Sequence, residues 1–249
     1  MRYSEPHLST GEDPSTGYRV DIVTADGGRV LPQLVHSLLN GNYAVSETFK
    51  DTSQTYIARI RIEEQDLVLK IPRDRNKRTW QRFLSLFRSS ESFRHLHSMI
   101  TLRKLGFHCP EPIMALQTVR AGHIIDSALV YRFEEGHKPQ HEDIPRVINT
   151  LLSLHRLGYL RRDPHAKNFL VQADRVTFID FRLSKPILFR QLRLNRELCA
   201  FLRTTPEGLH HLEPEFQRTL WFRLALKLDR LLSAFKKIRR GTRRRMKGS

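Results

Sequence analysis

The sequence has few cysteines and no long apolar run. Cys109 and Cys199 lie ninety residues apart and form no CxxC pair. This excludes a cysteine-based zinc ribbon and a disulfide scaffold, and it is typical of a reducing compartment. No segment approaches the roughly 18–20 apolar residues that cross a bilayer. The first ten residues also lack the apolar core of a signal peptide. We therefore expect a cytoplasmic protein, either soluble or bound at a membrane surface.

The length and composition fit a folded protein with a sizeable core. The chain has 249 residues, of which 39% are hydrophobic and 9% aromatic. Such a composition excludes wholesale disorder and a fibrous protein. The length predicts either one large domain or two small lobes.

Positive charge is concentrated at the C-terminus. Residues 216–249 contain twelve Lys and Arg and a single acid, Asp229, so they carry +11 of the formal net charge of +17. Apolar residues within this stretch are spaced by threes and fours, as in an amphipathic helix: Phe216, Leu220, Leu224, Leu228, Leu231, Phe235 and Ile238. A basic amphipathic terminus predicts contact with an anionic membrane surface or a nucleic-acid backbone. Alternatively, the helix packs against the core and only the tail is solvated.

Strand patterns dominate the first third of the chain after a loosely ordered start at residues 1–17. Four strands are expected, at 18–24, 43–49, 56–62 and 66–71, with a turn at Ala25–Gly28 and a short helix at 31–40. Helical spacing follows over 79–105, ending at Gly106 in the usual C-terminal cap position. The segment 124–133, IIDSALVYRF, predicts one or two buried strands.

A second helix is expected from Ile144 to Leu157. Asp143 is placed to cap its start, Pro145 falls in its first turn, and Gly158 ends it. Short strands follow around 169–171 and 176–179, and the remainder is mostly helical. The order predicts an α+β fold of two lobes, with a flexible N-terminus at 1–17, a strand-rich lobe at 18–135, a smaller helical lobe at 136–215, and a basic helix and tail at 216–249.

The segment GYLRRDPHAKNFLVQADRVTFIDF carries the most informative chemistry. Asp163 lies in a loop after a helix, Asn168 follows five residues later, and Asp180 ends the second strand of a hairpin. This order brings two carboxylates and an amide to the mouth of the hairpin. Phosphoryl transfer uses such a set, because one carboxylate positions the hydroxyl nucleophile while the amide and the other carboxylate hold Mg²⁺.

Lys70 is the candidate cation for the phosphates of a nucleotide. It lies in the apolar strand Leu67–Ile71, on the face of Val68 and opposite Leu67 and Leu69. An unpaired lysine in such a strand is costly. A strand lysine, then D-x-x-x-x-N, then an aspartate at a strand end is the order of the protein-kinase signature set.

The chain resembles the protein-kinase-like phosphotransferases, and most closely the bacterial lipopolysaccharide core heptose/Kdo kinases. The segment 163–169, DPHAKNF, resembles their D-P-H-x-x-N-F catalytic loop. The basic segment from Asn76 to Phe83 and the Arg- and Leu-rich segment 190–202 are similar as well. The resemblance covers roughly residues 43–205 and implies a two-lobe protein-kinase-like fold.

The resemblance implies a role for each matching residue. Asp163 becomes the catalytic base, Asn168 and Asp180 the magnesium ligands, and Lys70 the phosphate-binding lysine. The adenine-binding hinge falls at 133–136, so Phe133, Glu134 and Glu135 join the ATP-binding residues. Glu91, the only glutamate between Lys70 and Gly106, is the candidate ion-pair partner of Lys70, although Arg94 competes for that alignment position.

The implied activity is ATP- and Mg²⁺-dependent phosphorylation of a heptose or Kdo hydroxyl of the lipopolysaccharide inner core. The expected location is the cytoplasmic face of the inner membrane, where a basic tail suits an anionic lipid-linked acceptor. Nucleic acid is not expected as a partner.

Several positions depart from the protein-kinase pattern. The sequence has no G-x-G-x-x-G, so the nucleotide loop would be Asp51–Thr55, binding phosphate through backbone N–H groups and hydroxyls. The Asp-Phe-Gly triplet is replaced by Asp180-Phe181-Arg182, and Arg161 stands where histidine is usual. No A-P-E motif follows, which favours a small or lipid-linked acceptor over a peptide.

Two alternatives stay open: a small RIO-like Ser/Thr protein kinase, and a non-catalytic pseudokinase that docks at a membrane. Arg161 and Arg162 either receive a phosphorylated substrate or support the loop, and His165 either contacts the loop or is structural. The twelve histidines lack a zinc-binding spacing.

Overall fold

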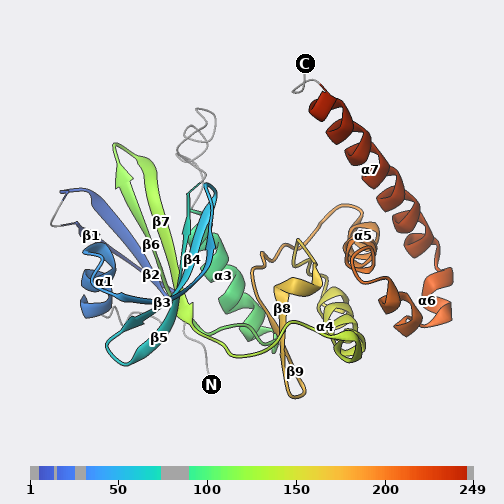
Figure 1. Cartoon of the computed structure of the whole chain (residues 1–249), viewed down its shortest axis with the longest axis horizontal. Coiled ribbons are helices and arrows are strands. Elements are labelled where there is room, and N and C mark those ends of the chain that lie inside the picture. Colours follow the sequence, from blue (N-terminus) through green and yellow to red (C-terminus); the bar gives the residue numbers. More distant parts are fainter. Residues whose placement is uncertain (1–5, 14–15, 26–31, 74–89, 246–249) are drawn as a thin grey trace. The chain divides into compact units, whose positions relative to one another are not determined.

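The structure is a computed structural model that describes residues 6–13, 16–25, 32–73 and 90–245, with side-chain surroundings described up to residue 234. The chain divides between Glu135 and Gly136 into two compact parts. We call them the N-terminal unit (residues 1–135) and the C-terminal unit (residues 136–249). The first is rich in strands and the second in helices (Figure 1). The predicted α+β class is therefore confirmed.

The N-terminal unit is built on a sheet of seven antiparallel strands in the order β1-β2-β6-β7-β5-β4-β3. The strands are β1 (His7–Glu12), β2 (Arg19–Thr24), β3 (Ala44–Asp51), β4 (Thr55–Ile62), β5 (Gln65–Pro72), β6 (Pro112–Arg120) and β7 (His123–Arg132). β5 lies between β4 and β7, so Lys70 belongs to a strand paired on both sides.

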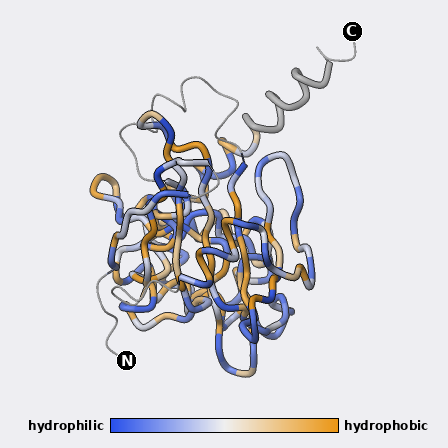
Figure 2. The backbone as a smooth tube through the Cα atoms, turned by 90° about the vertical axis from the view of Figure 1, so that its left-hand side faces the viewer, coloured by the Kyte–Doolittle hydropathy of each residue, from blue (hydrophilic) through white to orange (hydrophobic). Residues whose placement is uncertain are grey.

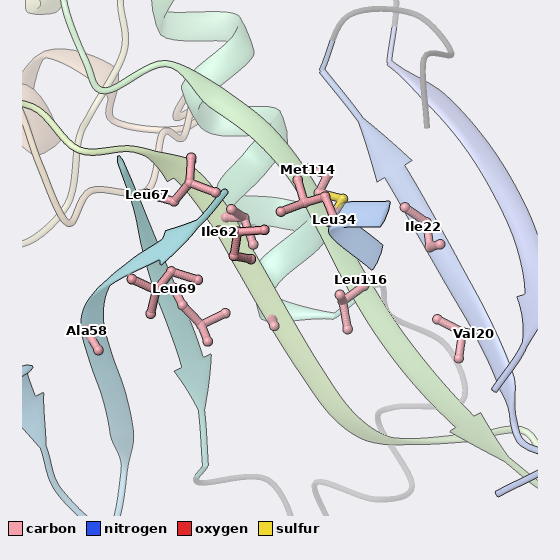
Figure 3. Close-up of a cluster of buried hydrophobic side chains, with 12 residues drawn as sticks. Val20, Ile22, Leu34, Ala58, Ile62, Leu67, Leu69, Met114 and Leu116 are labelled. Atoms are coloured by element: carbon pink, nitrogen blue, oxygen red, sulfur yellow. The ribbon is translucent and has the colours of Figure 1, made fainter. Parts of the chain in front are cut away.

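Among the described residues of this unit, two helices pack on the sheet. Helix α1 (Pro32–Leu39) places Leu34 in a buried apolar cluster that also contains Leu67 and Leu69 of β5 (Figure 3). Helix α3 (Glu91–Lys104) contacts β5, β6 and β7. Because side chains alternate along a strand, Val68 and Lys70 lie on the face opposite Leu67 and Leu69.

Helix α3 ends as the sequence predicted. Gly106 has a φ of +86°, and its N–H donates to the Arg103 carbonyl at 3.0 Å while the Phe107 N–H donates to the Leu102 carbonyl at 3.2 Å. These two bonds are the glycine-dependent helix end known as a Schellman motif. The earlier part of the predicted helix, the basic segment 76–83 and part of the turn at 25–28 lie outside the described residues.

The N-terminus differs from the prediction. Residues 7–12 form β1 instead of a loosely ordered segment, and β1 pairs with β2 over its full length, from His7 opposite Thr24 to Glu12 opposite Arg19. No strand was predicted over β6 either. β1 is an edge strand whose partner is β2, and β6 pairs with β7 and with β2, which is distant from it in sequence. Edge position and long-range pairing depend on the tertiary context, so the local pattern gave little signal.

The C-terminal unit surrounds one small hairpin with helices. Its elements are η2 (His141–Asp143), α4 (Ile144–Arg156), η3 (Ala166–Asn168), β8 (Phe169–Gln172), β9 (Arg175–Phe178), α5 (Arg190–Leu202), η4 (Pro206–His211), α6 (Pro214–Arg218) and α7 (Leu220–Arg245). The strands β8 and β9 pair antiparallel, and their buried rings, Phe169 and Phe178, lie 5.1 Å apart between centroids. Along the chain, the interior strands carry the more hydrophobic segments (Figure 2).

Asp143 does not cap helix α4. It closes the short helix η2, where it accepts from the Gln140 N–H at 3.0 Å and from the Arg146 guanidinium at 3.0 Å. The 3₁₀ turn continues directly into α4, and the carboxylate therefore binds groups on either side of the helix start. The predicted bounds of α4 are otherwise confirmed.

The C-terminal amphipathic segment forms two helices, α6 and α7, with a break at Thr219. α7 packs against α5, and it does so through the buried residues Phe222 and Ala225. Arg203, directly after α5, donates to both oxygens of Asp229 at 2.6 and 2.7 Å. The apolar stripe singled out in the sequence points elsewhere, because Leu220, Leu224 and Leu231 are 75%, 38% and 58% exposed. The helix therefore packs on α5, as one of the two interpretations expects, while these three residues of the apolar stripe stay exposed.

Candidate functional site

The Asp163 loop (residues 159–168) connects α4 to β8. Helix α4 ends at Gly158, which has a φ of +82°. The Gly158 N–H donates to the His155 carbonyl at 2.8 Å, and the Tyr159 N–H donates to the Leu154 carbonyl at 3.2 Å. This ending turns the chain sharply away from the helix axis and starts the loop at a fixed place.

Asp163 and Asn168 meet within this loop. The Asn168 Nδ2 donates to the Asp163 Oδ2 at 3.1 Å and to the Asp163 carbonyl at 3.0 Å. The second carboxylate oxygen, Oδ1, lies 3.1 Å from Nε2 of His165. The Asp163 side chain is nevertheless 61% exposed, so it is both oriented and accessible to another molecule.

Asp180 follows the hairpin directly. The Ile179 N–H donates to the Asn168 carbonyl at 3.1 Å, which joins the end of the hairpin to the end of the Asp163 loop. Asp163 and Asp180 both have left-handed backbone conformations, with φ of +53° and +47°. Such conformations are uncommon for residues other than glycine and cluster at functional sites.

Arg161 is the central support of this arrangement. Its side chain is fully buried, and its guanidinium donates to the carbonyls of Asp163 at 3.2 Å, Asn168 at 3.2 Å and Ile179 at 3.0 Å. It also stacks on the Phe169 ring at 4.4 Å from the centroid. One side chain therefore ties together the backbone beside each of the three predicted site residues. Of the two roles considered for Arg161, the structure supports the scaffold.

The buried guanidinium keeps its charge at neutral pH. Burial lowers the pKa of Arg161 to about 10, while the negative charges of Glu197, Asp163 and Asp180 oppose this fall. Below that pH the side chain remains a cation, and it holds the three carbonyls with charge-assisted hydrogen bonds, which are stronger than neutral ones.

Glu197 of α5 holds the same loop from the other side. Its Oε2 accepts from the Arg161 N–H at 3.1 Å and its Oε1 from the Arg162 N–H at 2.6 Å. His155 of α4 completes the contact, with its Nε2 2.9 Å from the Glu197 Oε2. Both side chains are less than a tenth exposed. Glu197 and His155 were not predicted as site residues.

A signal for Glu197 existed in the sequence. It is the only acid in the segment 190–202, and it lies three residues after Leu194 and four before Phe201, which are both buried. A lone carboxylate on the apolar face of a helix needs partners. The sequence could not identify them, because they come from a loop 35 residues away.

The predicted ATP-binding residues belong to the N-terminal unit. Lys70 is buried, at 8% exposure, and its neighbours across the sheet are Ile57 on β4 and Leu129 on β7. The Ser92 Oγ of α3 donates to the Ser127 Oγ of β7 at 3.0 Å. The sheet face that carries Ser127 and Leu129 is thus covered by α3.

Glu91 is the first residue of α3, directly after the N-cap Ser90, whose Oγ accepts from the Phe93 N–H at 3.1 Å. The predicted pair therefore comes from two elements that contact each other, β5 and α3.

Phe133, Glu134 and Glu135 end the N-terminal unit. The Phe133 N–H donates to the Asp66 carbonyl at 3.1 Å, which continues the pairing of β7 with β5. The Phe133 ring stacks with Phe49, with the centroids 6.2 Å apart, and its centroid lies 3.8 Å from the Arg59 guanidinium carbon. Glu134 is half-buried and Glu135 is exposed.

The expected nucleotide loop, Asp51–Thr55, forms the turn between β3 and β4. The Thr52 Oγ1 accepts from the N–H groups of Gln54 at 3.4 Å and Thr55 at 3.2 Å. Those N–H groups are therefore already hydrogen-bonded, and phosphate binding through them would require this turn to open.

In the described parts of the chain, no group of three or more His, Cys, Asp or Glu side chains is arranged to hold a metal ion. A magnesium site at the hairpin would draw on one amide and one carboxylate, Asn168 and Asp180. Their oxygen atoms are the ligands that this hard cation prefers. Because the Asn168 Nδ2 donates to Asp163, its amide oxygen is the atom left for a cation.

A known family matches this chain over the segment that contains all of these residues. The family model is described as a lipopolysaccharide core biosynthesis protein, WaaY, and it matches residues 18–197. The chain belongs to this family. The match confirms the resemblance to the lipopolysaccharide core kinases and the predicted function in phosphorylating the lipopolysaccharide core. The membership favours this function over a RIO-like protein kinase.

One solved structure, described as WaaP in complex with acyl carrier protein, is also similar to the chain. It shares 16% sequence identity, covers 78% of this chain and 86% of its own, and has a TM-score of 0.45. Among the helices that the structure describes, none has the length and apolar character needed to cross a membrane.

Proposed function

We propose that this member of the WaaY family transfers the γ-phosphoryl group of ATP to a heptose or Kdo hydroxyl of the lipopolysaccharide inner core, with Mg²⁺ as cofactor. The observation that carries the proposal is that one buried side chain, Arg161, joins the backbone at Asp163, Asn168 and Asp180. Its guanidinium donates to the carbonyls of Asp163 and Asn168 and to that of Ile179, the residue before Asp180. Phosphoryl transfer depends mainly on such fixed positioning.

In this proposal Asp163 accepts the proton of the sugar hydroxyl. Its carboxylate is held by Asn168 and His165 yet remains 61% exposed, so an acceptor can approach it. Asn168 and Asp180 hold the metal through oxygen atoms. When bound, Mg²⁺ supplies positive charge to the phosphate oxygens.

Lys70, Glu91 and Phe133–Glu135 make up the nucleotide-binding part of the proposal. Lys70 binds the α- and β-phosphates, and Glu91 orients it. Support comes from the position of Lys70 on a strand that is paired on both sides and contacts α3, the helix that begins with Glu91. The backbone of Phe133 to Glu135 receives the adenine base after the last strand of the sheet.

The acceptor is lipid-linked, and we propose that the C-terminal unit binds the anionic inner-membrane surface on its cytoplasmic side. Two exposed apolar features support this. The first is the stripe of Leu220, Leu224 and Leu231 on α7, and the second is the loop from Ile187 to Phe189, whose side chains are 93%, 69% and 70% exposed. Exposed apolar clusters of this kind mark interaction surfaces.

Charge favours a membrane as the partner of these features. The last fourteen residues contain eight Lys and Arg and no acid, and the one acid of α7, Asp229, is neutralised by Arg203. Each basic residue near anionic lipid contributes about 1 kcal/mol. A helix with an exposed apolar stripe and a basic surface is suited to lie in the plane of the interface.

Mass spectrometry of lipid A–core oligosaccharide after incubation with protein and Mg·ATP tests the reaction. We expect a gain of one phosphate, reduced at least about 100-fold in rate by Asp163→Asn, since a positioned base contributes about 10²–10⁴-fold. Asp180→Asn should abolish the Mg²⁺-dependent transfer of phosphate. Asp174→Asn is the matched control, because Asp174 lies exposed in the hairpin turn.

Two results would reject the proposal. Full activity of Asp163→Asn would show that Asp163 is not the catalytic base. Nucleotide binding without transfer to the oligosaccharide would identify a pseudokinase or another acceptor, and transfer to a protein substrate in the same assay would point to the protein kinase.

Flotation with vesicles containing phosphatidylglycerol tests the membrane surface. The double variant Leu224→Ser/Leu231→Ser should reduce binding about tenfold or more, since burying a leucine side chain contributes up to roughly 1.5–3 kcal/mol. Leu8→Ser is the control, because Leu8 is 58% exposed on β1 of the N-terminal unit. If the double variant and Leu8→Ser lost vesicle binding equally, or if neither lost any, the assignment of the α7 stripe as a membrane-binding surface would be rejected.

A further inference from the structure

The C-terminal unit contains a pocket that none of the predicted site residues lines. Its volume is about 500 Å³, within the range of roughly 300–1,000 Å³ typical of small-molecule sites. Helix α4 contributes Asn149 and Arg156, and the start of α5 contributes Arg190 and Gln191. His211, Leu212, Glu213 and Phe216 complete the wall.

The lining is suited to an anion. Arg156 and Arg190 bring two guanidinium groups to the pocket, against a single carboxylate, Glu213. Arg190 is the first residue of α5, a helix with no acid in its first turn and no side-chain cap. The positive end of the helix dipole therefore adds to the charge of the arginines.

The position of Arg190 depends on a glycine. A Cβ atom on Gly158 would lie 2.0 Å from the Arg190 Nη2, so the guanidinium lies directly over the bare backbone at the C-terminal end of α4. A cation is favourable there, and the contact holds the guanidinium beside the pocket.

A second, independent observation points to a ligand. Asn195 lines the pocket and is 97% buried, at 3% exposure. Its Nδ2 has no hydrogen-bond partner among the described residues. A buried donor without an acceptor costs about 1–3 kcal/mol, and a bound acceptor would remove that cost.

We propose that this pocket binds a phosphomonoester on a hydroxyl-rich body of the size of a sugar phosphate. Arginine guanidinium groups bind phosphate oxygens in a bidentate manner. The amides of Asn149, Gln191 and Asn195 supply donors and acceptors for hydroxyl groups. The apolar side chains of Leu152 and Phe216 in the same wall suit the carbon-bound hydrogens of a sugar ring.

The pocket is connected to the Asp163 loop. His155 lines the pocket, and its Nε2 lies 2.9 Å from Glu197, which accepts from the N–H groups of Arg161 and Arg162. Binding beside His155 therefore shifts the carboxylate that holds the loop. This coupling to phosphoryl transfer rests on the proposed function, whereas the binding site itself does not.

Isothermal titration of the full chain tests the site without ATP. The probes are glucose 6-phosphate, inorganic phosphate and glucose. We expect saturable binding of glucose 6-phosphate, weaker binding of phosphate, and none of glucose. Arg156→Gln and Arg190→Gln should each weaken binding about tenfold. Arg193→Gln is the matched control, since Arg193 is exposed on the same helix and lies outside the pocket lining.

Diffuse attraction to a basic protein is the main rival explanation. Equal weakening by Arg193→Gln, or phosphate binding as tight as that of glucose 6-phosphate, would overturn the sugar-phosphate site. Failure of all three probes to bind at millimolar concentration would do the same. Circular dichroism verifies that the surface variants remain folded.

An NMR readout separates this site from the kinase reaction. The Arg162 amide proton should shift when glucose 6-phosphate is added and should not shift with glucose, because Glu197 accepts that proton over 2.6 Å. Asp163→Asn should leave both binding and shift intact. An unmoved Arg162 resonance in the presence of bound sugar phosphate would overturn the coupling, even if the kinase reaction is established.

Discussion

Replacing Arg161 by methionine tests whether one buried side chain supports the candidate site. The substitution keeps an unbranched side chain as far as the position of the Arg161 Nε, but it removes the guanidinium carbon and nitrogens beyond it, together with their stacking on the Phe169 ring. Three carbonyls, those of Asp163, Asn168 and Ile179, then lose their donor.

The expected size of the effect follows from two opposing contributions. Each hydrogen bond from a charged donor contributes about 1.5–3 kcal/mol, so three are worth roughly 4.5–9 kcal/mol. Burial of the charge opposes this, because a fall in the pKa of Arg161 from 12.5 to about 10 corresponds to roughly 3 kcal/mol. The hydrogen bonds outweigh the desolvation, and Arg161→Met should lower the free energy of unfolding by about 1.5–6 kcal/mol.

Urea denaturation followed by circular dichroism measures this loss as a lower midpoint at unchanged slope. The unfolding free energy of Arg161→Lys should lie between those of the unmodified protein and Arg161→Met. An ammonium keeps the charge but lacks the planar group of donors that reaches three separate carbonyls. Kinase activity should fall by at least about tenfold in both variants, since Asp163 and Asp180 lose their anchored backbone.

The matched control is Arg162→Gln. Arg162 is exposed, and its side chain makes one hydrogen bond, to Ser184 at 3.2 Å, so its loss should cost about 0.5 kcal/mol or less. If Arg161→Met lost less than about 1 kcal/mol and kept full activity, the role of Arg161 as the support of the site would be refuted.

Two further predictions concern backbone strain and buried thiols. Gly158→Ala should lower stability by about 1–2 kcal/mol in a thermal melt, because a residue with a Cβ is strained at a φ of +82° and because Arg190 must move. The control is Gly41→Ala, which has a φ of +69° and no atom within 4 Å of the added Cβ, and which should show the backbone strain alone. Equal losses of stability in the two variants would contradict the contact between residue 158 and Arg190. Burial raises the pKa of the Cys109 and Cys199 thiols to about 12, so native protein should react slowly with a disulfide reagent at pH 8 and rapidly once unfolded. Because the unfolded thiols lose protons first, near pH 9, stability should fall above that pH by about 1.4 kcal/mol per pH unit for each thiol; rapid labelling of native protein at pH 8 would contradict their burial.

Local signals in the sequence located most of the regular elements. The strands around Lys70 and the helices ending at Gly106 and Gly158 were predicted because alternation, helical spacing and glycine caps act over a few residues. The edge strand β1 was not, since its apolar pattern is weak and its hydrogen bonds all go to β2. Asp143 was placed correctly in the chain, but its partners were not predicted, because a 3₁₀ turn precedes α4.

The orientation of α7 shows a different limit. The helix carries apolar residues on two faces, and spacing alone does not tell which face the core covers. The longer stripe, with Leu224 and Leu231, is exposed, while Phe222 and Ala225 pack against α5. Packing against α5 and the ion pair between Arg203 and Asp229 fix this orientation, and neither can be obtained from the helix sequence.

The candidate residues of the reaction can be identified from the sequence. The order of Lys70, Asp163, Asn168 and Asp180 and the DPHAKNF segment indicated the family, because phosphoryl transfer constrains the type and spacing of such residues along the chain. The side chains that support them are identified only by the folded chain. Arg161 is a buried scaffold whose guanidinium stacks on the Phe169 ring of the hairpin. Glu197 supports the same loop from α5, where it accepts from the N–H groups of Arg161 and Arg162. Both roles depend on burial and on contacts between residues distant in sequence, which no local pattern specifies.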